Sequence, residues 1–153
     1  MTTATQPATD GARILVVEDS GDFRLLLETV LTDAGYVVDS AETSEAALSL
    51  LEDGDYDLLL SDYSLPGHSG AWLVARVKQR TAARPIPAMI ITGDPDAPGI
   101  PRDQPVVPKP VDFERLLVRI RKMLANDASH DSRSTGRFII PPRSSSSGES
   151  SAF

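Results

Sequence analysis

The chain has 153 residues and a formal net charge of −7. An acidic chain disfavours nonspecific binding to nucleic acid, which needs a basic face. The sequence contains no cysteine, so disulfide scaffolds, thiolate zinc sites and thiol catalysis are excluded, and its two histidines, His68 and His130, make a histidine-rich metal site or a Ser-His-Asp triad hard to build.

Short apolar runs alternate along the chain with stretches whose apolar residues recur every three or four positions. The runs predict strands and the recurring patterns predict helices. In chain order we expect a strand at 13–17, a helix over about 23–34, a strand at 36–40, a helix at 44–53, a strand at 57–61, a loop at 62–70, a helix at 71–80, strands at 88–92 and 105–107, and a helix at 111–124.

The two ends of the chain differ from this middle part in composition. Residues 1–12 are small and polar and predict a disordered leader without the apolar segment of a signal peptide. Residues 127–153 contain nine serines and one small apolar cluster, which is too little apolar surface to fold alone, and predict a disordered tail. No apolar run approaches the roughly 20 residues of a membrane span. We therefore expect a cytoplasmic chain with one domain at 13–126.

Strands that alternate with helices predict an α/β fold, with a parallel sheet covered by helices on both faces. In such open sheets, chemistry gathers at the carboxyl ends of the strands. Five candidate groups fall there: Glu18 and Asp19 follow the first strand, Asp62 the third, Thr92 ends the fourth, and Lys109 follows the fifth.

Three carboxylates at one point repel one another, and their pKa values would rise without a counter-charge. A hard divalent cation such as Mg²⁺ relieves this repulsion, since it takes oxygen ligands. A carboxylate beside Mg²⁺ can also attack phosphorus and form an aspartyl phosphate. The charged oxygens of that group would then be held by the metal, by the Lys109 ammonium and by the Thr92 hydroxyl with nearby backbone N–H groups.

Four motifs together resemble the receiver domain of bacterial two-component response regulators, over about residues 13–125: "VVEDS", "LLLSDYSLPGHSG", "IITG" and "PKP". The resemblance implies a flavodoxin-like, doubly wound five-stranded parallel sheet in the order 2-1-3-4-5. It implies that Asp62 is the phosphoacceptor, Thr92 the switch hydroxyl and Lys109 the lysine of the site. The implied Mg²⁺ ligands are Glu18, Asp19, Asp62 and the backbone carbonyl of Ser64. It also implies a cis peptide bond between Lys109 and Pro110.

The resemblance further implies the partners. A histidine kinase or a histidine phosphotransfer protein would donate the phosphoryl group, and a downstream protein would receive the signal. Such receivers catalyse their own phosphorylation and hydrolysis, but we do not expect an enzyme in the metabolic sense. The 127–153 segment is too short for a helix-turn-helix module, so a stand-alone receiver with no nucleic-acid partner is expected. "RFIIPPR" (137–143) is either a docking motif or part of an unstructured end.

Three other readings are open to such a sequence. A haloacid dehalogenase-type phosphatase carries its nucleophile in a D-x-D pattern after the first strand, and "EDSGD" does not match it. A P-loop enzyme needs G-x-x-x-x-G-K-[ST], which is absent. A pseudo-receiver that only binds partners, without phosphorylation, would not need all five groups.

The sequence departs from the receiver pattern between its fourth and fifth strands. The family places an aromatic residue three positions before the lysine, where this chain has Val106, and the stretch after Thr92 is short and carries five prolines. A proline in a helix interior costs roughly 3 kcal/mol. We therefore expect the family's fourth helix to be shortened or absent and the sheet to be less covered there. Signalling would use the loop at 93–105 instead of a threonine–aromatic relay.

Two side chains near these features carry weaker expectations. Trp72 lies off the inward face of its helix, so it is expected to shield the gap, to contact a partner, or simply to be exposed. His68 lies in the Asp62 loop and is expected to be a solvated turn residue.

Overall fold

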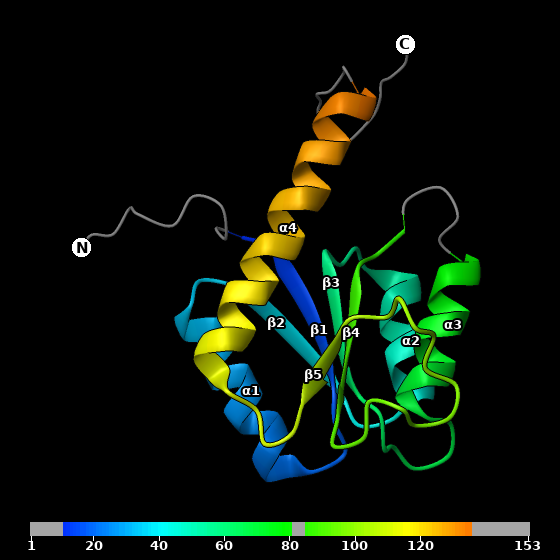
Figure 1. The fold of residues 1–153 in the computed structure, drawn as a ribbon. Coiled ribbons are helices and arrows are strands. Elements are labelled where there is room, and N and C mark those ends of the chain that lie inside the picture. The colour runs from blue at the N-terminus through cyan, green and yellow to red at the C-terminus, as the bar shows by residue number, and fades with distance from the viewer. Residues whose placement is uncertain (1–10, 81–84, 136–153) are drawn as a thin grey trace.

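A computed structural model describes residues 11–80 and 85–135, and it shows one parallel sheet between two pairs of helices (Figure 1). The strands are β1 (Arg13–Val17), β2 (Val37–Ala41), β3 (Leu58–Asp62), β4 (Ala88–Thr92) and β5 (Val106–Pro108). The helices are α1 (Gly21–Asp33), α2 (Ser44–Asp53), α3 (Gly70–Arg80) and α4 (Phe113–Thr135). No helix in these ranges is long and apolar enough to cross a membrane.

The strand order is β2-β1-β3-β4-β5, and every pair of neighbouring strands is parallel. This confirms the predicted flavodoxin-like α/β fold. β1 and β3 lie side by side in the middle of the sheet, so the residues that follow them meet at one edge. Asp62 ends β3 opposite Ile91 of β4, which places Thr92 one residue further along that same edge.

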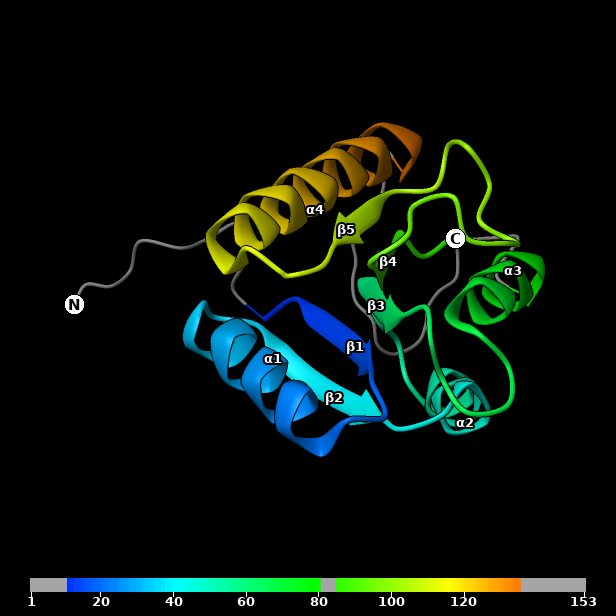
Figure 2. The same cartoon turned by 60° about the horizontal axis from the view of Figure 1, so that its bottom comes forward.

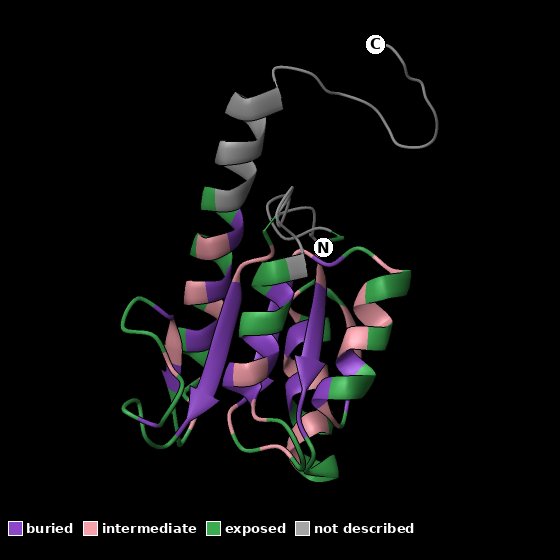
Figure 3. Ribbon diagram, turned by 90° about the vertical axis from the view of Figure 1, so that its right-hand side faces the viewer, coloured by how far each residue is buried: buried purple, intermediate pink, exposed green. Residues whose placement is uncertain are grey.

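The two faces of the sheet carry separate cores because side chains alternate along each strand. α1 and α4 cover one face, and α2 and α3 cover the other (Figures 1 and 2). β3 and β4 are buried along their whole length, as the apolar runs predicted (Figure 3). The first core takes Leu27 and Leu31 from α1, and the second takes Leu73, Val74 and Val77 from α3.

The chain runs from β4 to β5 through turns, with no helix between them. The prediction of a missing fourth helix is therefore confirmed, and the label α4 belongs to the C-terminal helix. The expectation of a less covered sheet is only partly met. Ala97 is buried in this loop and Ile100 packs against the core under α2 and α3, so the loop itself covers that region.

Some boundaries and inward positions differ from the predictions. The spacing of Phe23, Leu26, Leu27 and Val30 predicts that Leu26 faces the core, but Leu26 is 45% exposed and Leu31 is buried. α4 continues to Thr135, past the expected domain end at Asn126. The segments 1–10 and 136–153, with the "RFIIPPR" motif, lie outside the described residues, so the leader and the rest of the tail stay predictions.

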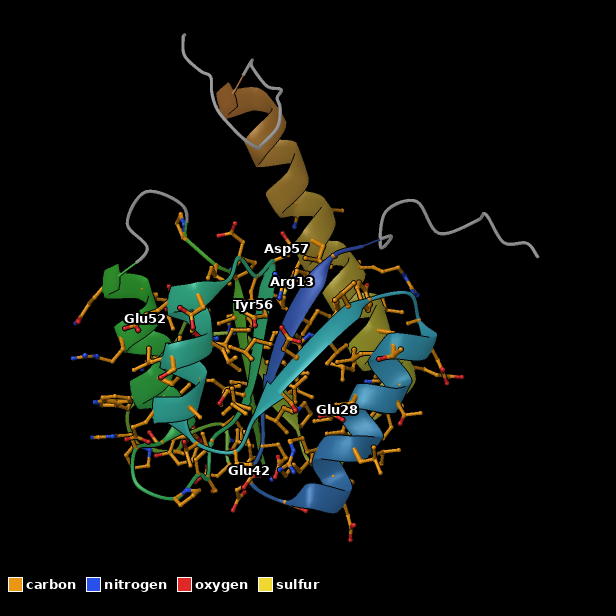
Figure 4. The ribbon with its side chains drawn as sticks, turned by 180° about the vertical axis from the view of Figure 1, so that it is seen from behind. Arg13, Glu28, Glu42, Glu52, Tyr56 and Asp57 are labelled. Carbon is orange, nitrogen blue, oxygen red and sulfur yellow. The ribbon has the colours of Figure 1, made fainter. Side chains whose placement is uncertain are left out.

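A polar network near the amino edge of the sheet joins the start of β1 to the middle of β2 and to the residues just before β3. The Arg13 guanidinium donates to Asp39 (2.8 Å) and lies over the Tyr56 ring, 4.8 Å from its centroid. The Tyr56 hydroxyl donates to the same Asp39 oxygen (2.6 Å), and the Arg13 N–H donates to Asp57 (2.8 Å). Figure 4 shows Arg13, Tyr56 and Asp57 together at this edge, with Glu42 at the opposite one. The network joins β1 and β2 to the entry of β3.

Candidate functional site

Asp62 lies at the carboxyl end of β3 and is only 2% exposed. Its Oδ2 accepts a hydrogen bond from the Ser64 N–H (3.1 Å), and its Oδ1 lies 2.7 Å from Lys109 Nζ. That contact is an ion pair, and buried Oδ1 has no further hydrogen-bond donor among the described residues. The Lys109 side chain is 41% exposed, so it approaches the buried carboxylate from the solvent side.

Glu18 and Asp19 come from the end of β1, beside β3. The Glu18 N–H donates to Ala41 O (3.0 Å). This bond continues the β1–β2 pairing and fixes the backbone position of Glu18. Glu18 is 3% exposed, whereas Asp19 is exposed. Oε2 of Glu18 accepts from the Ser20 N–H (3.1 Å), and buried Oε1 accepts nothing from the described residues.

Oxygens of Glu18, Asp19 and Asp62 lie within 4.8 Å of one another. Burial raises the pKa of Glu18, a backbone hydrogen bond from Ser20 opposes that rise, and the nearby Asp62 charge adds to it. Removal of water outweighs the attraction of the Lys109 ammonium, so an ionised Glu18 is not fully compensated by the protein.

This donor set fits a hard divalent cation. Mg²⁺ prefers oxygen ligands and binds through a few carboxylates while it keeps several waters. The unpaired Oε1 of Glu18 and the open position on Oδ1 of Asp62 are buried anionic oxygens that a cation would satisfy. Asp19 adds a third carboxylate from the solvent side of the cluster.

Thr92 and Ser64 lie at the same edge, and both make hydrogen bonds with backbone or side-chain groups near Asp62. The Thr92 hydroxyl contacts the backbone of Asp94: it accepts from the Asp94 N–H (3.0 Å) and donates to the Asp94 carbonyl (3.2 Å). Ser64 is a donor to Asp62 through its N–H, and a ligand role for its carbonyl stays a prediction. The Lys109 N–H donates to Thr92 O (3.1 Å), and the Lys109–Pro110 bond is cis, as expected.

Two features of the site were not predicted. A Cβ added to Gly70 would lie 2.2 Å from the Asp62 carbonyl oxygen, so the start of α3 approaches the backbone of Asp62 more closely than any side chain would permit. The Tyr63 hydroxyl donates to Pro98 O (2.6 Å) and so joins the residue after Asp62 to the loop between β4 and β5. The only sequence feature that could have indicated this contact is the tyrosine directly after Asp62.

His68 is exposed as expected, but it is not isolated. Its ring stacks on Trp72, with centroids 3.7 Å apart, and its Nδ1 lies 2.5 Å from a Glu45 oxygen. The Arg76 guanidinium lies 5.3 Å from the Trp72 centroid. Trp72 is half-buried against the core under α2 and α3, so it shields part of that face. This cluster ties the loop after Asp62 to α2 and α3.

Comparison with known proteins decides the family. The sequence profile of the response regulator receiver domain matches residues 14–121. The chain belongs to this family. Receivers of this family are signalling modules of two-component systems rather than classical enzymes. Their acidic pocket, which binds Mg²⁺, corresponds here to the cluster of Glu18, Asp19 and Asp62.

Relatives of known sequence or structure agree with this assignment. The transcriptional activator protein IrlR of Burkholderia pseudomallei is 32% identical over 126 residues, which are 78% of this chain and 53% of IrlR. The chain therefore spans about half the length of that relative. A signal receiver domain of an HD domain-containing protein from Pseudomonas fluorescens has a TM-score of 0.71 at 28% identity, with 87% of this chain and 99% of the other covered. A putative response regulator from Chloroflexus aurantiacus has a TM-score of 0.69 at 30% identity, with 76% and 99% covered.

Proposed function

We propose that this chain accepts a phosphoryl group on Asp62, with Mg²⁺ bound by Glu18, Asp19, Asp62 and the Ser64 carbonyl. The observation that carries the proposal is the position of the Asp62 carboxylate. It is buried, lies 2.7 Å from the Lys109 ammonium, and shares a 4.8 Å cluster with two further acids. The donor would be a histidine kinase or a histidine phosphotransfer protein in the cytoplasm, and the output would be binding to a downstream protein.

The reaction is a transfer between a nitrogen and an oxygen. An oxygen of the Asp62 carboxylate attacks the phosphorus of a phosphohistidine, a P–O bond forms, and the P–N bond breaks with its electron pair left on the imidazole nitrogen. The Lys109 ammonium neutralises negative charge next to the attacked phosphorus, and the Ser64 N–H orients the carboxylate. Bound Mg²⁺ would supply charge neutralisation for the phosphoryl oxygens.

Thr92 completes the proposed site. Thr92 is the last residue of β4 and follows Ile91, which pairs with Asp62. Its hydroxyl makes two hydrogen bonds with the backbone of Asp94. A rotation of that side chain would exchange the Asp94 carbonyl for a phosphoryl oxygen, which is a stronger, charged acceptor. The hydroxyl would then report on the phosphorylation of Asp62.

Acetyl phosphate with Mg²⁺ tests the proposal. The intact mass should increase by that of one phosphoryl group in the native chain and in Asp33→Asn, an exposed control. It should stay unchanged in Asp62→Asn and fall when Mg²⁺ is chelated. No mass increase in the native chain would overturn the proposal and favour the alternative, a pseudo-receiver that binds partners without phosphorylation.

A further inference from the structure

The loop from Gly93 to Pro105 stands where a receiver would have its fourth helix, and three polar contacts hold it. Near its start, the Asp94 backbone contacts the Thr92 hydroxyl. In its middle, the Pro98 carbonyl accepts from the Tyr63 hydroxyl at 2.6 Å. At its end, buried Gln104 donates to the Ala88 carbonyl at 2.7 Å. The first two contacts come from residues at the Asp62 edge of the sheet.

Tyr63 has a fixed backbone and a side chain that reaches out of the site. Its N–H donates to Ile91 O (2.8 Å) and its carbonyl accepts from the Gly70 N–H (2.9 Å). The position of its Cα is therefore set by β4 and by the start of α3. Its ring is half-buried against the core under α2 and α3, and Ile100 of the loop packs against the same core. A shift of the loop must change the hydroxyl contact, since the backbone of Tyr63 cannot follow.

Thr92 holds the other end of the same segment. Its hydroxyl shares the Asp94 carbonyl with the Ala97 N–H, which lies 3.0 Å from that oxygen. If this hydroxyl turned toward a phosphoryl group, the Asp94 N–H would lose its acceptor and the first turn of the loop would lose two bonds. Pro95, Pro98 and Pro101 provide no N–H groups to replace them.

On β5, this chain lacks the aromatic residue that the receiver pattern places three positions before the lysine. Val106 has a stiff, β-branched side chain with no ring to reorient. Its carbonyl, on the open edge of the sheet, accepts from the Arg119 guanidinium of α4 at 2.5 Å. Pro108, the next residue with the same orientation, has no N–H. This edge is thus held by α4, while the loop is held by the site.

We infer that Tyr63 is a positioning residue that latches the 93–105 loop in its unphosphorylated arrangement, and that phosphorylation of Asp62 releases this latch. The inference rests on the proposed phosphorylation of Asp62. Because Thr92 and Tyr63 hold one segment, loss of the Thr92 contact weakens the Tyr63 contact as well. The released surface comprises the loop and the start of α3, where a Cβ added to Gly99 would lie 3.5 Å from the Ala71 Cβ.

The test compares Tyr63→Phe with Tyr36→Phe. The first variant keeps the ring and removes the hydroxyl that donates to Pro98. The second makes the same chemical change at a buried hydroxyl that has no hydrogen-bond partner among the described residues. Two measurements are made on the full chain: the affinity for beryllofluoride with Mg²⁺, from the fluorine NMR signal of the bound anion, and hydrogen exchange at the amides of Asp94, Ala97 and Ile100.

Removal of a latch that favours the unphosphorylated form must raise the affinity for the phosphoryl mimic by the same factor, by thermodynamic reciprocity. One neutral hydrogen bond is worth about a fivefold change. We therefore expect Tyr63→Phe to bind beryllofluoride about fivefold more tightly than the native chain and to exchange these amides faster before the mimic is added. Adding the mimic should accelerate exchange at all three amides in the native chain and in Tyr36→Phe. In Tyr63→Phe it should still accelerate exchange at Asp94, which loses its Thr92 acceptor, but little further at Ala97 and Ile100.

Two results would overturn the inference. One is an unchanged beryllofluoride affinity in Tyr63→Phe, even if its loop exchanges faster, because that describes a structural contact without coupling to the site. The other is a native loop whose exchange does not respond to the mimic. If the native chain neither binds beryllofluoride nor gains mass with acetyl phosphate, the proposed function itself fails, and this inference falls with it.

Discussion

Glu18 is a carboxylate that the folded chain buries without full compensation. Its pKa is raised from 4.5, chiefly by burial, so the folded state binds this proton more tightly than the unfolded state. The resulting stabilisation is fully present below about pH 4.5 and is lost as the pH rises through the raised folded pKa. At pH 7 the ionised side chain therefore lowers the stability of the metal-free protein.

Glu18→Gln should make the metal-free protein more stable at pH 7, by about 1 kcal/mol, because it removes a buried charge. The same change should weaken Mg²⁺ binding, since an anionic ligand is lost. Urea unfolding with and without Mg²⁺ measures both effects. Asp19→Asn is the matched control: its carboxylate is exposed, so Mg²⁺ binding should weaken with little change in metal-free stability. A destabilised metal-free Glu18→Gln would contradict this account of the site.

The location of the charged and hydroxyl-bearing residues at the strand ends could be predicted, because it follows from the strand pattern alone. Glu18, Asp62 and Lys109 come together because parallel strands end at one edge. The contact of Tyr63 with Pro98 could not be predicted in this way. It joins residues 35 positions apart through the path of an irregular loop, which no periodic pattern describes.

At the scale of elements, the junction of β3 and α3 depends on Gly70. Its helix begins so close to Asp62 that an added Cβ would lie 2.2 Å from the Asp62 carbonyl oxygen and 2.9 Å from Ser61 Oγ. Gly70→Ala must therefore push α3 away from β3. We expect a loss of about 1–3 kcal/mol in the free energy of unfolding, and weaker Mg²⁺ binding because Asp62 shifts.

Gly93→Ala provides the control for that substitution. An added Cβ there meets nothing within 4 Å, so its unfolding free energy should change by no more than about 0.5 kcal/mol. Chemical denaturation of the two variants decides the matter. Equal stability of Gly70→Ala and Gly93→Ala would show that the close approach is not a real constraint.

The network at the amino edge predicts an acid-dependent loss of stability. The hydrogen bond from Tyr56 and the bond and charge of Arg13 lower the pKa of Asp39 below 3.8. The folded state therefore releases this proton more readily, and the stabilisation is present above about pH 3.8 and lost as the pH falls through the lowered folded pKa. Both side chains of the Arg13 pair are 39% exposed, so solvent limits the effect to about 0.5 kcal/mol. Asp39→Asn should flatten the curve of stability against pH in this range. An unchanged curve in Asp39→Asn would contradict the prediction.

The type and order of the elements could be predicted, and their details could not. Five prolines after Thr92 exclude a regular helix, and the structure has none there. The exposure of Leu26 and burial of Leu31 depend on how α1 is rotated against β1 and β2, because both positions fit a helical spacing. The end of α4 was placed too early, since polar residues after Leu124 resemble a tail although the backbone stays helical to Thr135.

For the whole molecule, Leu124 is 8% exposed and is the last buried side chain up to Asn126, where the description of side chains ends. Truncation after Asn126 should therefore leave the thermal midpoint nearly unchanged, although it shortens α4. Truncation after Met123 removes Leu124 as well and should cost roughly 2 kcal/mol. Thermal unfolding of the two truncated chains measures this difference. A drop of many degrees after Asn126 would show that the segment beyond it packs on the domain.

The central claim is that Asp62, among the clustered carboxylates, carries the phosphoryl group. Borodeuteride reduction of the acetyl-phosphate-treated chain converts an acyl phosphate into an alcohol, and peptide mass mapping then locates it. We predict reduction at Asp62 alone, dependent on Mg²⁺. Reduction at Glu18 or Asp19, or at none of the three while the chain still gains mass, would contradict the account.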